Sequence, residues 1–156
     1  MALQDQLKAK GRVGIVLKDE SGNVKETREV DNLVVTDGLE FIIDRMVGTN
    51  TAVMSHMQVG SGTTNPAAND SDIESNLGGK VAMSGSTGSV TDNGTSVTYS
   101  ATFAAGTGTG AVTEAAITNN GSNATGVMLC RVEFDVINKG ANDSMTIEWT
   151  VSLTAS

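Results

Sequence analysis

The spacing of apolar residues predicts one helix, over residues 36–47. Five apolar side chains recur at intervals of three and four residues and would share one helical face: Leu39, Ile42, Ile43, Met46 and Val47. Asp37 and Glu40 have the spacing of a capping box, and Thr36 is an alternative N-cap. Gly48 can close the last turn in the left-handed conformation. We expect this helix to lie across the end or face of a sheet and to cover its core.

Alternation of apolar and polar residues predicts strands through much of the remaining chain. The clearest strand runs from Ser144 to Thr154, holds a period of two throughout and places Trp149 in the core. The run from Gly126 to Ile137 has the same period. It would point Met128, Cys130, Val132, Phe134 and Val136 inward and Arg131, Glu133 and Asp135 outward.

Shorter runs complete the predicted strands. Arg12 to Leu17 and Val24 to Val35 form a hairpin whose second arm is charged, which indicates a solvated face or a protected edge. Further strands are predicted at Met54–Val59, Ser96–Ala104 and Ala111–Thr118, separated by glycine- and asparagine-rich turns. We therefore expect a mainly β protein, an antiparallel, jelly-roll-like β-sandwich with one α-helix packed against it, forming a single domain over residues 11–156.

Composition agrees with this fold class. The chain has 156 residues, of which 38% are hydrophobic, 3% are aromatic and 18 are glycine, as suits many short strands joined by small-residue turns. Its formal charge of −8 disfavours nucleic-acid binding, and its single cysteine excludes an internal disulfide and argues against a zinc site. We also expect no membrane contact, because no run approaches roughly 20 apolar residues and the first residues lack a signal-like apolar core.

Two segments fall outside the predicted strands. Residues 1–10 form a polar arm that is long enough for one or two helical turns. Leu3 and Leu7 are four residues apart, so they would form a thin apolar stripe that is useful only for binding a partner. A frayed terminus without a role is the alternative. Residues 60–79 exceed an ordinary loop and contain Asn65 and the only proline, Pro66, so they form either a functional surface loop or an arm that packs on a neighbour. Leu3, Leu7, Asn65 and Pro66 are the candidate partner-binding residues.

No catalytic pattern emerges. His56 is the only histidine and has no partner of suitable spacing, and Cys130 lies on the apolar side of its strand, where it acts as a small hydrophobe. We therefore expect no enzymatic activity, no catalytic residues and no cofactor.

Two further patterns resemble ligand-binding loops only weakly. Asp70, Asp72 and Glu74 alternate like the first ligands of a calcium loop, but the required glycine and distal glutamate are missing. Whether these carboxylates hold a cation stays open. The glycines between Gly106 and Gly110 lack phosphate-loop spacing and predict a flexible hairpin turn.

Four phrases resemble a family of small virion structural proteins of tailed bacteriophages. They are N-L-V-V-T-D-G-L-E-F-I-I-D-R-M from Asn32, M-S-H-M-Q-V-G-S-G-T-T-N-P-A-A-N-D from Met54, Y-S-A-T-F-A-A-G-T-G-T-G-A-V-T-E-A-A-I from Tyr99, and M-L-C-R-V-E-F-D-V-I-N-K-G-A-N-D-S-M-T-I-E-W-T-V from Met128. The resemblance implies a β-sandwich that assembles on the particle and has no catalytic residues.

The resemblance leaves two function classes open. The first is a capsid decoration (cement) protein, a homo-oligomer that binds the major capsid protein or other virion proteins and its own copies. The second is a tail-fibre, neck or tail-adaptor protein that binds a receptor or partner. In both, the protein would belong to the virion and would occupy the host bacterial cytoplasm during assembly.

Overall fold

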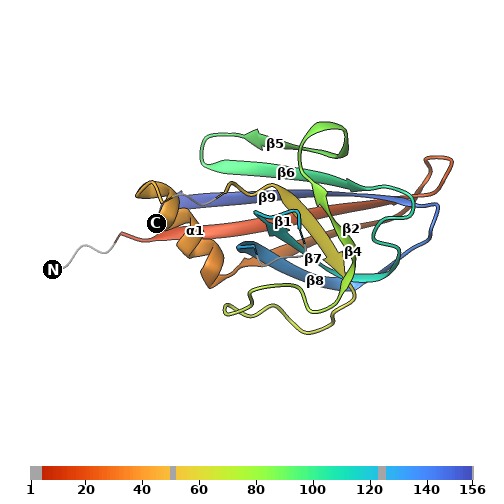
Figure 1. The fold of residues 1–156 in the computed structure, drawn as a ribbon, viewed down its shortest axis with the longest axis horizontal. Helices are drawn as coiled ribbons and strands as arrows, with labels where there is room; N and C mark the ends of the chain where they lie inside the picture. Colours follow the sequence, from red (N-terminus) through yellow and green to blue (C-terminus); the bar gives the residue numbers. More distant parts are fainter. Residues whose placement is uncertain (1–4, 50–51, 123–125, 156) are drawn as a thin grey trace.

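A computed structural model of the chain describes residues 5–49, 52–122 and 126–155. The described chain is mainly β, with nine strands and one α-helix (Figure 1), which confirms that part of the expected fold class. In chain order the elements are β1 (Leu7–Lys18), β2 (Val24–Val34), α1 (Thr36–Met46), β3 (His56–Gly60), β4 (Asn76–Ala82), a short 3-10 turn η1 (Gly85–Thr87), β5 (Gly88–Asp92), β6 (Ser96–Phe103), β7 (Gly110–Thr118), β8 (Met128–Lys139) and β9 (Ser144–Ala155).

The strands form one antiparallel sheet that nearly closes into a barrel. Their order is β4-β3-β7-β8-β2-β1-β9-β6-β5. Strand β2 joins the two halves: it pairs with β1 along most of its length, but only Leu33 and Val34 pair with β8. The charged part of β2 therefore borders an opening in the sheet, where Lys25 forms an ion pair with Asp143 (2.7 Å). The expected edge character of this arm fits its position.

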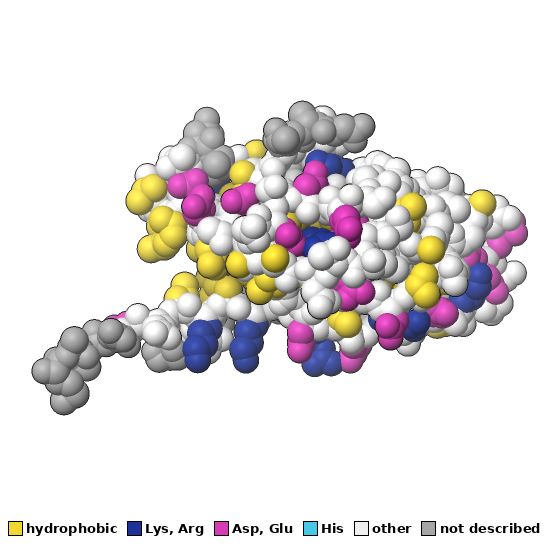
Figure 2. All heavy atoms as spheres, turned by 90° about the horizontal axis from the view of Figure 1, so that it is seen from below, with side chains coloured by type: hydrophobic (Ala, Val, Ile, Leu, Met, Phe, Trp, Pro, Cys, Tyr) yellow, Lys and Arg dark blue, Asp and Glu magenta, His cyan; other side chains and the backbone are white. Residues whose placement is uncertain are grey.

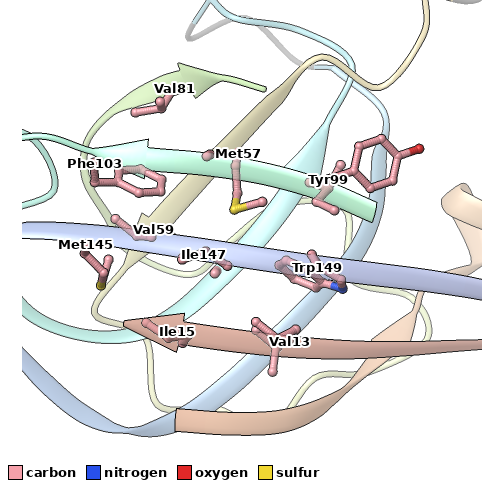
Figure 3. Close-up of a cluster of buried hydrophobic side chains, with 14 of the residues drawn as sticks. Val13, Ile15, Met57, Val59, Val81, Tyr99, Phe103, Met145, Ile147 and Trp149 are labelled. Carbon is pink, nitrogen blue, oxygen red and sulfur yellow. The ribbon is translucent and has the colours of Figure 1, made fainter. Parts of the chain in front are cut away.

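Trp149 lies in the middle of the core, as its strand pattern predicts. β9 is paired on both sides, with Val13 of β1 and Tyr99 of β6 in register with Trp149. All three side chains are buried (Figure 3). Sulfur-containing and aliphatic side chains from β3 cover them from the opposite half of the sheet. Strand pairing on both sides and apolar packing around Trp149 together fix the position of β9.

The predicted helix is present, but its buried face differs from the prediction. Gly38 is its one buried residue. The helix lies so close to β8 at this point that a side chain would overlap the Leu129 carbonyl oxygen. Phe41 and Ile42 pack partly against the core, whereas most of the predicted inward face is exposed: Leu39 (47%), Ile43 (58%), Met46 (76%) and Val47 (74%).

The predicted C-terminal end of the helix is confirmed, whereas the predicted N-terminal cap is wrong. Val35 is the N-cap and no side chain caps the helix, so neither Thr36 nor the expected Asp37–Glu40 capping box does so. Gly48 does adopt the left-handed conformation (φ +72°). The first turn of the helix therefore packs closely on β8 at Gly38 and has no side-chain cap.

Two other sequence expectations need correction. Strand β1 begins at Leu7 and pairs with β9 as far as Ala155, so residues 7–10 are strand rather than helix; Leu3 lies outside the described residues. The glycines from 106 to 110 do not form a hairpin turn, because β6 pairs with β5 and β9 while β7 pairs with β3 and β8. Their left-handed conformations instead carry the chain between the two halves of the sheet.

Strand β8 differs from the sequence expectation in two places. Its register against β7 shifts between Glu133 and Ile137, so the inward row passes from Phe134 to Ile137 and leaves Val136 43% exposed. Arg131 points outward, as predicted, but is only 3% exposed because the loop between β3 and β4 covers it. The burial of this charged side chain identifies the candidate functional site.

Candidate functional site: a clamped loop on the outer face of β7 and β8

A buried ion pair on the outer face of the sheet holds the long loop between β3 and β4. Glu114 of β7 is fully buried, and Arg131 lies beside it on β8. The Arg131 Nε group donates to Glu114 Oε2 (3.0 Å), and Nη2 lies 2.9 Å from the same oxygen, within ion-pair distance. A paired guanidinium and carboxylate are the form in which charges are tolerated inside a protein. Residues 61–75, called here the clamped loop, cover this pair.

Glu114 ties both ends of the clamped loop to the sheet. Its Oε1 accepts backbone N–H bonds from Gly62 (2.9 Å) and Ser75 (2.9 Å), and its Oε2 accepts one from the Glu74 backbone (3.0 Å). The Thr113 hydroxyl donates to the Gly62 carbonyl oxygen (2.6 Å). One buried carboxylate therefore satisfies backbone groups that a long irregular loop would otherwise leave unpaired.

Arg131 organises the middle of the clamped loop. Its Nη1 donates to Asp70 Oδ2 (2.8 Å), and its Nη2 donates to the Thr64 carbonyl oxygen (3.0 Å) and lies 3.8 Å from Glu74 Oε2. These groups line a polar hollow of about 270 Å³. Basic and acidic side chains meet near the middle of the face shown in Figure 2.

The carboxylates considered as cation ligands have internal partners. Asp70 and Glu74 converge on the Arg131 guanidinium, whereas Asp72 accepts from the Gln58 amide (2.7 Å). Within the described ranges, no group of three or more histidine, cysteine, aspartate or glutamate side chains is placed to hold a metal ion. The protein's own cation thus occupies the point where two of the three carboxylates meet.

Hydrogen bonds lower the pKa of both carboxyl groups below their ordinary values. For Glu74, the Thr64 backbone N–H lowers the pKa most, with help from the Thr64 hydroxyl and the Thr63 backbone. Burial raises the pKa of Asp70, but the Ala67 backbone N–H and the Arg131 guanidinium outweigh burial and lower it overall. Both groups are therefore held in the charged form that the clamp needs.

The clamp presents two of the candidate partner-binding residues. Asn65 is exposed and Pro66 half-buried, and they lie between segments held by Glu74 on one side and by Asp70 on the other. The Ala68 carbonyl oxygen accepts from the Thr36 backbone (2.8 Å), which connects the loop to the start of α1. Leu7 lies elsewhere, at the exposed start of β1.

The residues considered for catalysis lie apart from this clamp. His56 Nδ1 is 2.8 Å from the hydroxyl of its neighbour Ser55, and among the described residues no carboxylate bonds to its ring. Cys130 is fully buried, and burial raises the pKa of its thiol well above the ordinary value. Burial also lowers the pKa of Lys139, whose Nζ donates to the Ala104 carbonyl oxygen (3.0 Å).

Sequence reasoning overlooked Glu114. It assigned Arg131 to the correct, outward face but did not foresee that a loop buries its side chain there. A signal was available: Glu114 interrupts the otherwise uncharged run from Ala111 to Thr118, and Arg131 interrupts Met128 to Val132. Single charges inside apolar strands are seldom buried without a partner, so two such charges in neighbouring strands indicate a pair.

The comparisons with known proteins give no match. No protein family model, curated protein or solved structure matches this chain. Among the described helices, none has the length and apolar content that crossing a membrane requires.

Proposed function

We propose that this protein is a non-enzymatic structural protein of a bacteriophage virion, a capsid decoration (cement) subunit that binds the major capsid protein through the clamped loop. The observation that carries the proposal is the buried Glu114–Arg131 pair, which holds an exposed polar loop in one conformation. A loop fixed before binding loses little conformational entropy when it docks. The virion-protein resemblance of the sequence supplies the class of partner.

The same proposal includes a jelly-roll-like sandwich and the binding of further copies of this protein. The jelly-roll-like sandwich implied by the resemblance is supported by the short β2–β8 pairing, which separates β5-β6-β9-β1 from β4-β3-β7-β8. The protein binds its own copies as well as the capsid, and many copies turn weak contacts into durable attachment. Nucleic acid is not a partner, in keeping with the charge of −8.

The alternative is a tail-fibre, neck or tail-adaptor protein. A carbohydrate-binding surface usually presents aromatic platforms. Here Tyr99, Phe103, Phe134 and Trp149 are buried and Phe41 packs partly against the core, which favours the decoration role. Copy number separates the two: band quantification on purified virions should give hundreds of copies per particle for a decoration protein, and a few dozen or fewer for a tail component.

The attachment test uses particles that lack this protein. Purified wild type, Asn65→Arg and Asn93→Arg are added, and the bound fraction is measured by sedimentation. Asn93 is an exposed asparagine in the turn between β5 and β6, so it is a matched control. We expect Asn65→Arg to weaken binding at least tenfold and Asn93→Arg to bind like wild type. Equal binding of all three would overturn attachment through the clamped loop.

A further inference from the structure

Helix α1 has a wide apolar surface, and the sheet covers only part of it. Its inward side places Gly38, Phe41 and Ile42 against the sheet. Its outward side carries a continuous stripe, called here the α1 ridge, made of Leu39, Ile43, Met46 and Val47, each about half to three-quarters exposed. An amphipathic helix normally turns its apolar residues toward the core and its polar residues toward solvent. Nothing in the described part of the chain covers the ridge.

Beside the α1 ridge lies an apolar notch. The inward rows of β1 and β9 continue past the end of the barrel to Leu7, which is 62% exposed, and to Leu153, which pairs with Ala9. A hollow of about 290 Å³ opens there between α1 and strands β6 and β9. In Figure 2, apolar side chains gather on both sides of an open notch at the α1 end of the molecule.

We propose that a second copy of this chain covers both features, in a two-fold dimer that seats the α1 ridge of each copy in the notch of the other. A two-fold contact uses one self-complementary surface, and a ridge beside a notch of matching apolar character is such a surface. The inference deepens the proposed function, on which it rests for self-association, by naming the surface that the copies share.

The exposed area fits a dimer. Taking each fully exposed side chain as roughly 150 Å², the fractional exposures of Leu7 and the four ridge residues leave on the order of 500 Å² per copy. Two copies would then bury roughly 1,000 Å², about the minimum for a specific interface, before the hollow is counted.

Charge around this end also permits self-association. Helix α1 carries exposed side chains of both signs, acidic Glu40 and basic Arg45, and acidic Asp92 lines the hollow. Each copy carries a formal charge of −8. At this end, however, both signs are present, so two copies brought together here do not face only charge repulsion.

The first test is sedimentation velocity over a range of protein concentrations. Ile43→Glu places a charge on the α1 ridge, and Val24→Glu is its matched control, because both positions are 58% exposed and Val24 lies at the opposite end of β1 and β2. We expect wild type and Val24→Glu to dimerise alike and Ile43→Glu to weaken the dimer at least a hundredfold. Dimers of equal strength in all three would overturn the proposal.

A second test fixes the geometry by disulfide formation. In a Cys130→Ala background, a Leu7→Cys protein is mixed with a Met46→Cys protein under mild oxidation. We expect cross-linked dimers from the mixture and few from either protein alone. Cross-linking of the Met46→Cys protein only with itself would indicate helix-to-helix packing and overturn the ridge-in-notch arrangement. A wild-type monomer that still binds particles would overturn this inference and leave attachment through the clamped loop standing.

Discussion

Strand β9 and the clamped loop are both fixed in place, but by opposite physical means. β9 is held by neighbouring strands on both sides and by apolar packing around Trp149. The clamped loop has no regular secondary structure between β3 and β4 and is held by one buried carboxylate and one guanidinium. Apolar burial adds stability in small increments over many residues, whereas the clamp concentrates its effect in two side chains.

The difference predicts where the molecule is sensitive. β9 should respond to lost volume and not to pH. The clamped loop should respond to the loss of a single charge and to acid, because its backbone bonds end on ionised groups. The surface proposed to bind the capsid is therefore stabilised separately from the core that supports it.

Trp149→Ala should cause the largest loss, about 3 to 5 kcal/mol of unfolding free energy, because it leaves a cavity beside Val13 and Tyr99. Trp149→Phe should cost less than about 1.5 kcal/mol, since the indole Nε1 is buried without a hydrogen-bond partner in the described structure and Phe keeps most of the volume. Urea unfolding measures both changes. Equal stability of the alanine variant and wild type would place Trp149 outside the core.

Arg131→Met should cost about 3 kcal/mol, because Glu114 would stay buried without its cation. Hydrogen exchange should rise throughout residues 61–75 while β9 stays protected. Arg12→Met is the control: Arg12 and Glu29 form an ion pair whose side chains are about 70% exposed, so its loss should change stability by less than about 1 kcal/mol. Unchanged protection of the loop in Arg131→Met would show that the clamp does not hold it.

Acid should loosen the clamped loop before it affects β9. Asp70 and Glu74 have lowered pKa values in the folded protein, so their stabilising effect is fully present above the ordinary carboxyl pKa of about 4 and is lost as the pH falls through the lowered values. The backbone amide resonances of Thr63 and Thr64 should therefore shift below about pH 4, while the indole resonance of Trp149 stays fixed. A midpoint above pH 4 for the loop amides would contradict the lowered values.

The same contrast explains which features the sequence predicted. β9, the β1–β2 hairpin and α1 follow from periodicity, since a strand or helix with a buried side repeats its apolar residues at a fixed interval. The exposed ridge of α1 did not follow, because periodicity marks an apolar face without saying what covers it. The clamp joins Glu114 and Arg131 across two strands to loop residues some 40 to 60 positions away, and no local pattern encodes such pairing.

The pairing of β1 with β9 constrains the order of folding. Leu7 lies opposite Ala155 and Lys18 opposite Ser144. Strand β1 can therefore pair with β9, its second neighbour, only after β9 has been made. On the ribosome the β1–β2 hairpin can form early, but β1 keeps one edge unpaired until β9 has been synthesised. Closing so large a loop is entropically costly, and sheets built on distant pairings fold slowly. The chain should therefore refold in a late, concerted step, and versions shortened by the last strand should expose the inward row of β1 and aggregate.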